Sequence, residues 1–135
     1  MRGLIVDYFG VLDGTEEDRQ GWRELLAEIG ENDVKLAVLS NEPQGPGAQR
    51  VKDDATTFYG IDTVILSGET GVEKPEAQAF ENAADVLGFG PRECVLVDDA
   101  IENVHGAVQI GMIGVFYQAF ERQAVELRSL FGLGK

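Results

Sequence analysis

Five short apolar runs alternate along the chain with segments in which apolar residues recur every three or four positions. Unbroken apolar runs of this length are typical of strands that are buried on both faces of a parallel sheet. Spacings of three and four place apolar side chains on one face of a helix. The predicted strands cover residues 4–6, 34–39, 63–66, 94–97 and 113–117, and the predicted helices cover residues 16–29, 48–58, 75–87, 100–110 and 120–131.

This alternation predicts an α/β fold. Parallel strands that follow one another through helices are joined by right-handed crossovers, so the helices cover both faces of one five-stranded sheet. The chain has 135 residues and shows no internal repeat, linker or low-complexity tract. We therefore expect one domain over residues 1–135.

Helix signals and turn residues refine these boundaries. Thr15 is the expected N-cap of the first helix, and Pro75 is expected in the first turn of the third. Residues 41–47 and 67–74 are rich in glycine and proline and are expected to form loops. The apolar residues of the fourth helix that we expect to face inward are Ile101, Val104 and Val108.

Charge and composition exclude several classes of partner. The chain carries 24 acidic and 11 basic residues, a net charge of −13. This argues against nucleic acid and against an anionic membrane surface as partners, because both need clustered Lys and Arg. The only cysteine, Cys94, begins an apolar run and is expected to be a buried small hydrophobe. No stretch is apolar and long enough to span a bilayer, and Met1 and Arg2 lead directly into a strand, so we expect no signal peptide and a cytoplasmic location.

Polar residues follow several of the predicted strands. Asp7 follows the first strand, Ser40 and Asn41 follow the second, and Asp98 and Asp99 follow the fourth. The carboxyl ends of parallel strands lie at one edge of the sheet, where ligands bind near the point at which strand order reverses. A carboxylate in such a position is costly unless it is solvated, paired or bound to a cation.

Lys74 joins this group from the loop after the third strand. Three neighbouring carboxylates repel one another and raise one another's pKa unless a cation neutralises them. Oxygen ligands select a hard ion such as Mg²⁺, which is usually held by one or two carboxylates, waters and substrate oxygens. Lys74 and Ser40 supply donors for an anion on the other side. The combination predicts phosphoryl transfer with a carboxylate as the nucleophile.

Four motifs occur in a fixed order. They are residues 5–12 (IVDYFGVL), 38–41 (VLSN), 72–75 (VEKP) and 96–99 (LVDD), the last followed by Glu102 and Asn103. In this ordered set the whole chain resembles the haloacid dehalogenase (HAD)-like superfamily of hydrolases. The resemblance implies a three-layer α/β/α, Rossmann-like fold.

The resemblance also implies roles for individual residues. Asp7 would be the nucleophile, and Ser40, Asn41 and Lys74 would bind the phosphoryl group, with Lys74 also steadying the nucleophile. The implied ligands of Mg²⁺ are Asp7, the backbone carbonyl of Phe9, Asp98 and Asp99.

Two further polar residues, Asn103 and His105, lie on the predicted helix over residues 100–110. Asn103 lies one helical turn beyond Asp99, so it either reaches the same metal through water or is an exposed helix residue. His105 has no partner in the motifs, and we expect it to lie on the surface.

One departure from the family concerns acid–base chemistry. Family phosphatases carry a second Asp two residues after the nucleophile, and here that position is Phe9. Losing a general acid or base typically costs about 10²–10⁴ in rate. Asp13 can replace it only if the turn folds back. The branch that cleaves carbon–halogen bonds also lacks this acid, because halide leaves without a proton.

The second departure is the lack of a cap domain, since neither connection that carries one in the family is long enough here. An open site argues against a dehalogenase, which needs a cap to bury its substrate. It favours either a small phosphorylated substrate at an open site or a larger substrate, with a partner such as a second copy of the chain as the lid. Tyr8 and Phe9 would form such a homodimer interface or pack against the turn.

The leading hypothesis is therefore a Mg²⁺-dependent HAD-like phosphohydrolase, acting best on esters or anhydrides with a good leaving group. The alternatives are a non-catalytic metal- and phosphate-binding or regulatory module and a 2-haloacid dehalogenase. A phosphoacceptor receiver domain is disfavoured, because receivers place paired acids after the first strand and a Lys after the last.

Overall fold

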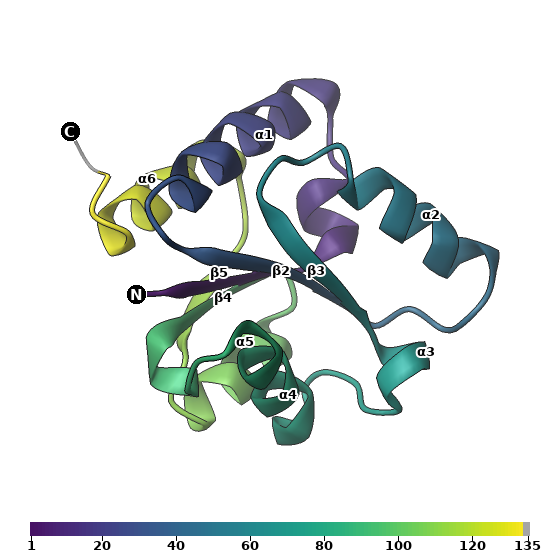
Figure 1. Ribbon diagram of the computed structural model, residues 1–135. Coiled ribbons are helices and arrows are strands. Elements are labelled where there is room, and N and C mark those ends of the chain that lie inside the picture. Colours follow the sequence, from purple (N-terminus) through teal and green to yellow (C-terminus); the bar gives the residue numbers. More distant parts are fainter. Residues whose placement is uncertain (134–135) are drawn as a thin grey trace.

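Five parallel strands form one sheet in the order β3-β2-β1-β4-β5 in the computed structural model, which describes residues 1–133 (Figure 1). The strands are β1 (Gly3–Val6), β2 (Lys35–Ser40), β3 (Ile61–Leu66), β4 (Cys94–Asp98) and β5 (Ile113–Phe116). The predicted α/β fold with a five-stranded parallel sheet is confirmed, and each predicted strand is found within two residues of its expected ends.

Helices cover both faces of this sheet. The helices and turns are η1 (Tyr8–Leu12), α1 (Glu16–Gly30), α2 (Pro46–Ala55), α3 (Ser67–Thr70), α4 (Ala77–Leu87), η2 (Pro91–Glu93), α5 (Ile101–Gln109) and α6 (Phe120–Leu130). Helices α1, α2 and α6 lie on one side of the sheet, and α4 and α5 lie on the other (Figure 1). The result is the three-layer arrangement that the alternation of strands and helices predicts.

Each helical layer has its own apolar core. On the side of α1, the buried Trp22 packs against the rings of Tyr117 and Phe120 from the end of the chain. On the other side, Phe80 of α4 is fully buried with residues of the opposite face of the sheet. Cys94 is also fully buried, and burial raises the pKa of its thiol to about 11, as befits an inert core residue.

Most local signals act as expected. The Thr15 hydroxyl accepts a hydrogen bond from the Asp18 amide at 3.1 Å and caps α1. Gly88 ends α4 in the left-handed conformation, with φ +88°.

Three local expectations are wrong. The loop 67–74 contains the short helix α3, because four residues are too few to give a periodic signal. Pro75 precedes α4, whose N-cap is Glu76. On α5 the buried residues are Val104 and Ala107, whereas Ile101 and Val108 are 46% and 51% exposed. The apolar face of that helix is therefore rotated from the predicted one.

The strand order fixes where a ligand can bind. β1 lies between β2 and β4, with Val6 opposite both Val38 and Val97. Strands β2 and β3 lie on one side of β1 in the sheet, and strands β4 and β5 lie on the other. The carboxyl ends of β1 and β4 flank this switch point, which is the usual ligand site in open α/β sheets. Among residues 1–133, no helix has the length and apolar character needed to cross a membrane.

Candidate active site

Two acids lie side by side at the carboxyl edge of the sheet. Asp7 directly follows β1 and Asp98 ends β4, and the pairing of Val6 with Val97 brings the two positions together. The Asp7 amide donates to the Val97 carbonyl at 2.9 Å, which extends the ladder by one step. Asp7 is 8% exposed and Asp98 is fully buried. Both carboxylates therefore need a positive partner.

Lys74 is that partner. Its side chain is 1% exposed, and Nζ lies 2.9 Å from Asp7 Oδ1 and 2.7 Å from Asp98 Oδ2. Nζ also donates to the Leu39 carbonyl at the end of β2, at 2.8 Å. An ammonium group has three N–H donors, so all three of its hydrogen bonds are made. The lysine joins three neighbouring strands and cannot turn toward solvent without leaving two buried acids unpaired.

The pKa of Asp7 rises from 3.8 to about 7 in the fold. Burial is the largest cause, and the neighbouring Asp98 raises the pKa further. Lys74 opposes both effects through its charge and its hydrogen bond. One lysine is thus insufficient to keep the pKa of Asp7 in its ordinary range.

Asn41 fixes the backbone of Lys74. The Asn41 side-chain amide donates to the Lys74 carbonyl and its oxygen accepts from the Lys74 amide, both at 2.9 Å. These two bonds join the loop after β2 to the loop before α4. They engage the Asn41 side chain with protein backbone, so the geometry supports a positioning role for this residue.

Three carboxylates form a group that fits a cation. Oxygens of Asp7, Asp98 and Asp99 lie within 4.8 Å of one another. When ionised, the three carboxylates and the one Lys74 ammonium sum to a net charge of −2, which a divalent ion would balance. An all-oxygen set of this kind suits Mg²⁺. The Phe9 carbonyl as a further ligand stays a prediction.

Gly10 is needed for Asp99 to fit. Its φ of +81° favours glycine, and a Cβ built at this position would overlap the Asp99 carboxylate. The turn η1 therefore passes directly over one member of the carboxylate group.

Asn103 contacts the site through Asp98. Its side chain donates to Asp98 Oδ2 at 3.2 Å, while Asp98 Oδ1 accepts from the Ala100 amide at 2.9 Å. These contacts orient the buried carboxylate. His105 is exposed on α5, as expected.

A cavity of about 340 Å³ opens over these residues. The buried Ser40 at the end of β2 lines it, opposite the acids on β1 and β4. Its walls are Asp7, Phe9, Gly10, Ser40, Asn41, Lys74, Asp98, Asp99, Ala100 and Asn103. Every residue predicted for catalysis, phosphate binding or metal binding is therefore brought to one cavity.

Phe9 is among the residues that line this cavity, with 47% of its surface exposed, and its ring meets that of Tyr8 edge-on. The turn does fold back after it, but Asp13 Oδ1 accepts from the Gly10 amide at 2.8 Å. Asp13 is not among the residues that line the cavity. Its carboxylate holds the turn and does not replace the missing acid.

A second set of contacts behind the turn η1 was not predicted. The Tyr8 hydroxyl donates to Asp54 Oδ2 at 2.7 Å, and Arg19 pairs with both Asp54 oxygens at 2.6 and 2.9 Å. Arg19 also donates to the Leu12 carbonyl at 2.9 Å. The turn η1, which directly follows Asp7, is thus tied to α1 and α2. Burial and the bond to Asp54 raise the pKa of Tyr8 to about 12.

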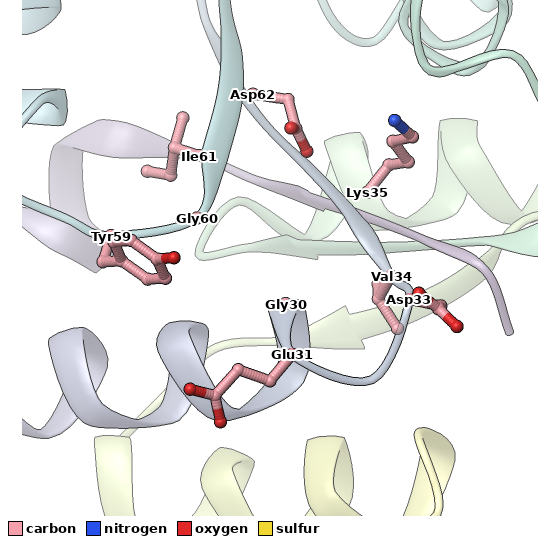
Figure 2. Close-up of a pocket in the computed structure, with 9 residues that line it drawn as sticks. All are labelled: Gly30, Glu31, Asp33, Val34, Lys35, Tyr59, Gly60, Ile61 and Asp62. Carbon is pink, nitrogen blue, oxygen red and sulfur yellow. The ribbon is translucent and has the colours of Figure 1, made fainter.

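A larger cavity of about 430 Å³ lies at the opposite, amino edge of the sheet (Figure 2). It is formed where α1 ends and where β2 and β3 begin. Asp62, one of the acidic residues that line it, accepts a hydrogen bond from the Leu36 amide at 2.8 Å and so stabilises the start of β2. It contains none of the residues predicted for chemistry, so the smaller cavity is the candidate active site.

Several known proteins resemble this chain in sequence. A family model described as "Hydrolase: haloacid dehalogenase-like hydrolase" matches residues 2–111. The N-acylneuraminate-9-phosphatase of Mus musculus is 29% identical over 91 residues, 67% of this chain and 36% of that protein. The glyceraldehyde 3-phosphate phosphatase of Methanopyrus kandleri is 39% identical over 67 residues, 49% of this chain and 29% of that protein. The chain thus spans well under two thirds of either relative.

Solved structures share the fold. An uncharacterized protein from Corynebacterium glutamicum is 56% identical with a TM-score of 0.93, covering 98% of this chain and 96% of that one. A HAD family enzyme from Bacteroides thetaiotaomicron, solved with magnesium and inorganic phosphate, is 17% identical with a TM-score of 0.66. That match covers 88% of this chain and 95% of that one, and it shows likeness of fold alone.

Proposed function

Because the chain belongs to the haloacid dehalogenase-like hydrolase family, we propose that it is a Mg²⁺-dependent phosphohydrolase with Asp7 as the nucleophile. The observation that carries the proposal is the Lys74 ammonium held between Asp7 and Asp98, beside a third carboxylate at an open cavity. This arrangement offers a nucleophile, a cation site and a pocket for a phosphoryl group within a few ångströms.

Each residue has a defined task. Lys74 holds the Asp7 carboxylate in place and offsets its charge, and Asn41 holds Lys74. Ser40 lines the pocket from β2 and would donate its hydroxyl to a phosphoryl oxygen. Asp7, Asp98 and Asp99 would hold Mg²⁺, which when bound offsets negative charge on the phosphoryl group and the acids.

The reaction proceeds in two displacements. An Asp7 oxygen attacks phosphorus, the new O–P bond forms, and the bond to the leaving group breaks with its electron pair going to that group. Water then attacks the phosphorus of the aspartyl phosphate, which restores the carboxylate and releases phosphate.

The described chain leaves the pocket uncovered. Between β1 and β2 it contains only η1 and α1, and between β3 and α4 only α3 and a short loop. Small phosphorylated compounds and larger phosphorylated substrates both fit an open site of this kind, and a second copy of the chain is the candidate lid.

The test is thermal unfolding with Mg²⁺ and beryllium fluoride, which mimics a phosphoryl group on a carboxylate. Ligand at about 100 times its Kd adds about 2.7 kcal/mol, which raises the midpoint by about 8–11 °C for a chain of this size. We expect this shift in the wild type only when both additives are present, and none in Asp7→Asn. The same substitution should abolish hydrolysis of any phosphate substrate that the wild type cleaves.

The outcomes separate two candidates. A shift in the wild type without turnover on any phosphate compound would favour a non-catalytic phosphate-binding module, which the hydrophobic Phe9 at the acid–base position also favours. An equal shift in Asp7→Asn, or hydrolysis that survives that substitution, would refute the proposal.

A further inference from the structure

The candidate site has a nucleophile but no side chain placed to protonate a leaving group. Phe9, two residues after Asp7, is one of the residues that line the cavity, and it is 47% exposed. A phenyl ring neither donates nor accepts a proton. Position 9 therefore supplies no proton to a leaving group, and its exposed side chain offers an apolar surface at the cavity.

The other proton carriers near the site are already engaged in the described part of the chain. Lys74 gives all three N–H groups to Asp7, Asp98 and the Leu39 carbonyl. Asp13 accepts from the Gly10 amide outside the cavity lining.

Two further groups are also accounted for. The Tyr8 hydroxyl points away to Asp54, and Asn103 donates to Asp98. Asp99 and Ser40 remain: Asp99 belongs to the carboxylate group that fits a cation, and the Ser40 hydroxyl is assigned to a phosphoryl oxygen.

We propose, resting on the phosphohydrolase function above, that the natural substrate is an acyl or aryl phosphate whose apolar part packs on the ring of Phe9. In the first displacement the Asp7 oxygen bonds to phosphorus and the P–O bond of the substrate breaks. The leaving group takes the electron pair and departs as a carboxylate or phenolate, anions that are stable without a proton. An alkoxide from an alkyl phosphate needs a proton that this site does not supply.

The second displacement has the same limitation. Water attacks the aspartyl phosphate without a base at position 9, and its proton passes to the departing phosphate, giving dihydrogen phosphate and the free carboxylate. For activated substrates this step limits turnover. A burst of leaving group equal to the enzyme concentration follows from that.

The experiment measures kcat/KM for acetyl phosphate, 4-nitrophenyl phosphate, phenyl phosphate and ethyl phosphate. It compares the wild type with Phe9→Asp and with Phe9→Asn, which matches the aspartate in shape but carries no acidic proton. In the wild type we expect acetyl and 4-nitrophenyl phosphate to react with a burst and ethyl phosphate to be at background. Phe9→Asp should lower the ratio of kcat/KM for 4-nitrophenyl phosphate to kcat/KM for ethyl phosphate by about 10²–10⁴, and Phe9→Asn should leave this ratio unchanged.

A further variant, Phe9→Leu, tests the aromatic contact. It should raise KM for the aryl phosphates more than for acetyl phosphate, because only the former present a ring to position 9.

The results distinguish this inference from the function on which it rests. If Mg²⁺ and beryllium fluoride stabilise the wild type through Asp7 but ethyl phosphate reacts as well as 4-nitrophenyl phosphate, the substrate class is wrong and the function stands. Failure of acetyl and 4-nitrophenyl phosphate to react with a protein that binds beryllium fluoride also overturns the substrate class. Absence of beryllium fluoride binding through Asp7 overturns both.

Discussion

Replacing Lys74 with methionine tests whether the buried lysine holds the site together. The substitution keeps the length of the side chain and removes the charge, so Asp7 and Asp98 both lose the counter-charge that Lys74 supplies. Removing one member of a buried charge pair typically costs about 3–5 kcal/mol. For 135 residues this corresponds to a fall in Tm of about 10–18 °C.

Lys52→Met is the matched control. Lys52 pairs with Glu69 on the surface, with its side chain 38% exposed, and a surface pair is worth about 0–1 kcal/mol. Both variants are followed by urea unfolding and by calorimetry. If Lys74→Met unfolds within about 1 kcal/mol of the control, the buried lysine is not the counter-charge that the geometry implies.

The pH dependence of the same variant gives an independent check. The pKa of Asp7 is raised to about 7 in the fold, and loss of Lys74 removes an effect that lowers it. A carboxyl group with a raised folded pKa binds protons more tightly in the native state, so acidification through that pKa stabilises the fold. The free energy of unfolding that Lys74→Met loses relative to the wild type should therefore be smaller at pH 5 than at pH 8. A deficit that is constant over this range would contradict the assignment.

Two other predictions follow from contacts around the turn η1. Gly10→Ala and Gly71→Ala both place a side chain at φ +81°, which costs about 1–2 kcal/mol, but only at Gly10 would the new Cβ overlap Asp99. The affinity for Mg²⁺, measured by calorimetric titration, should therefore fall in Gly10→Ala alone. An equal fall in both variants would refute the role of the overlap. Asp54→Asn should lose about 1.5–3 kcal/mol near neutral pH, because it breaks the charged hydrogen bonds to Arg19. Arg19 lowers the pKa of Asp54, so this stabilisation is complete above about pH 4 and is lost as pH falls through the folded pKa. In urea unfolding, the free energy of unfolding should therefore fall more steeply with acidification in the wild type than in the variant. Identical slopes in the two proteins would refute this prediction.

The positions of the acids at the sheet edge were predictable from the sequence. Apolar runs mark the strands, and an acid that ends such a run must emerge at the carboxyl edge, which places Asp7 and Asp98 together once the sheet is parallel. Lys74 was expected near them, but its burial was not, because no periodic pattern in the loop 67–74 shows which way the side chain turns. The double hydrogen bond from Asn41 supplies that direction.

The contacts among Tyr8, Arg19 and Asp54 could not be read from the chain. The residues come from three elements, and each has the polar character of an ordinary helix surface or turn. Only the packing of α2 beside η1 brings them together. The face of α5 was mispredicted for a related reason, since its short apolar pattern is compatible with more than one rotation and the sheet selects Val104 and Ala107.

The buried lysine and the exposed phenylalanine have opposite consequences for how such a protein can change over generations. Lys74 is bonded to two acids at once, so its loss leaves two buried acids without a counter-charge, and such a mutation can persist only if a second mutation compensates for it. Phe9 is half exposed, its ring meets that of Tyr8, and it is no part of the ion pairs of Lys74, so a change there leaves the charged group intact. Under the proposed function, selection can therefore alter which leaving groups are accepted in single steps, while Lys74 and the two acids that it pairs with are inherited as a unit.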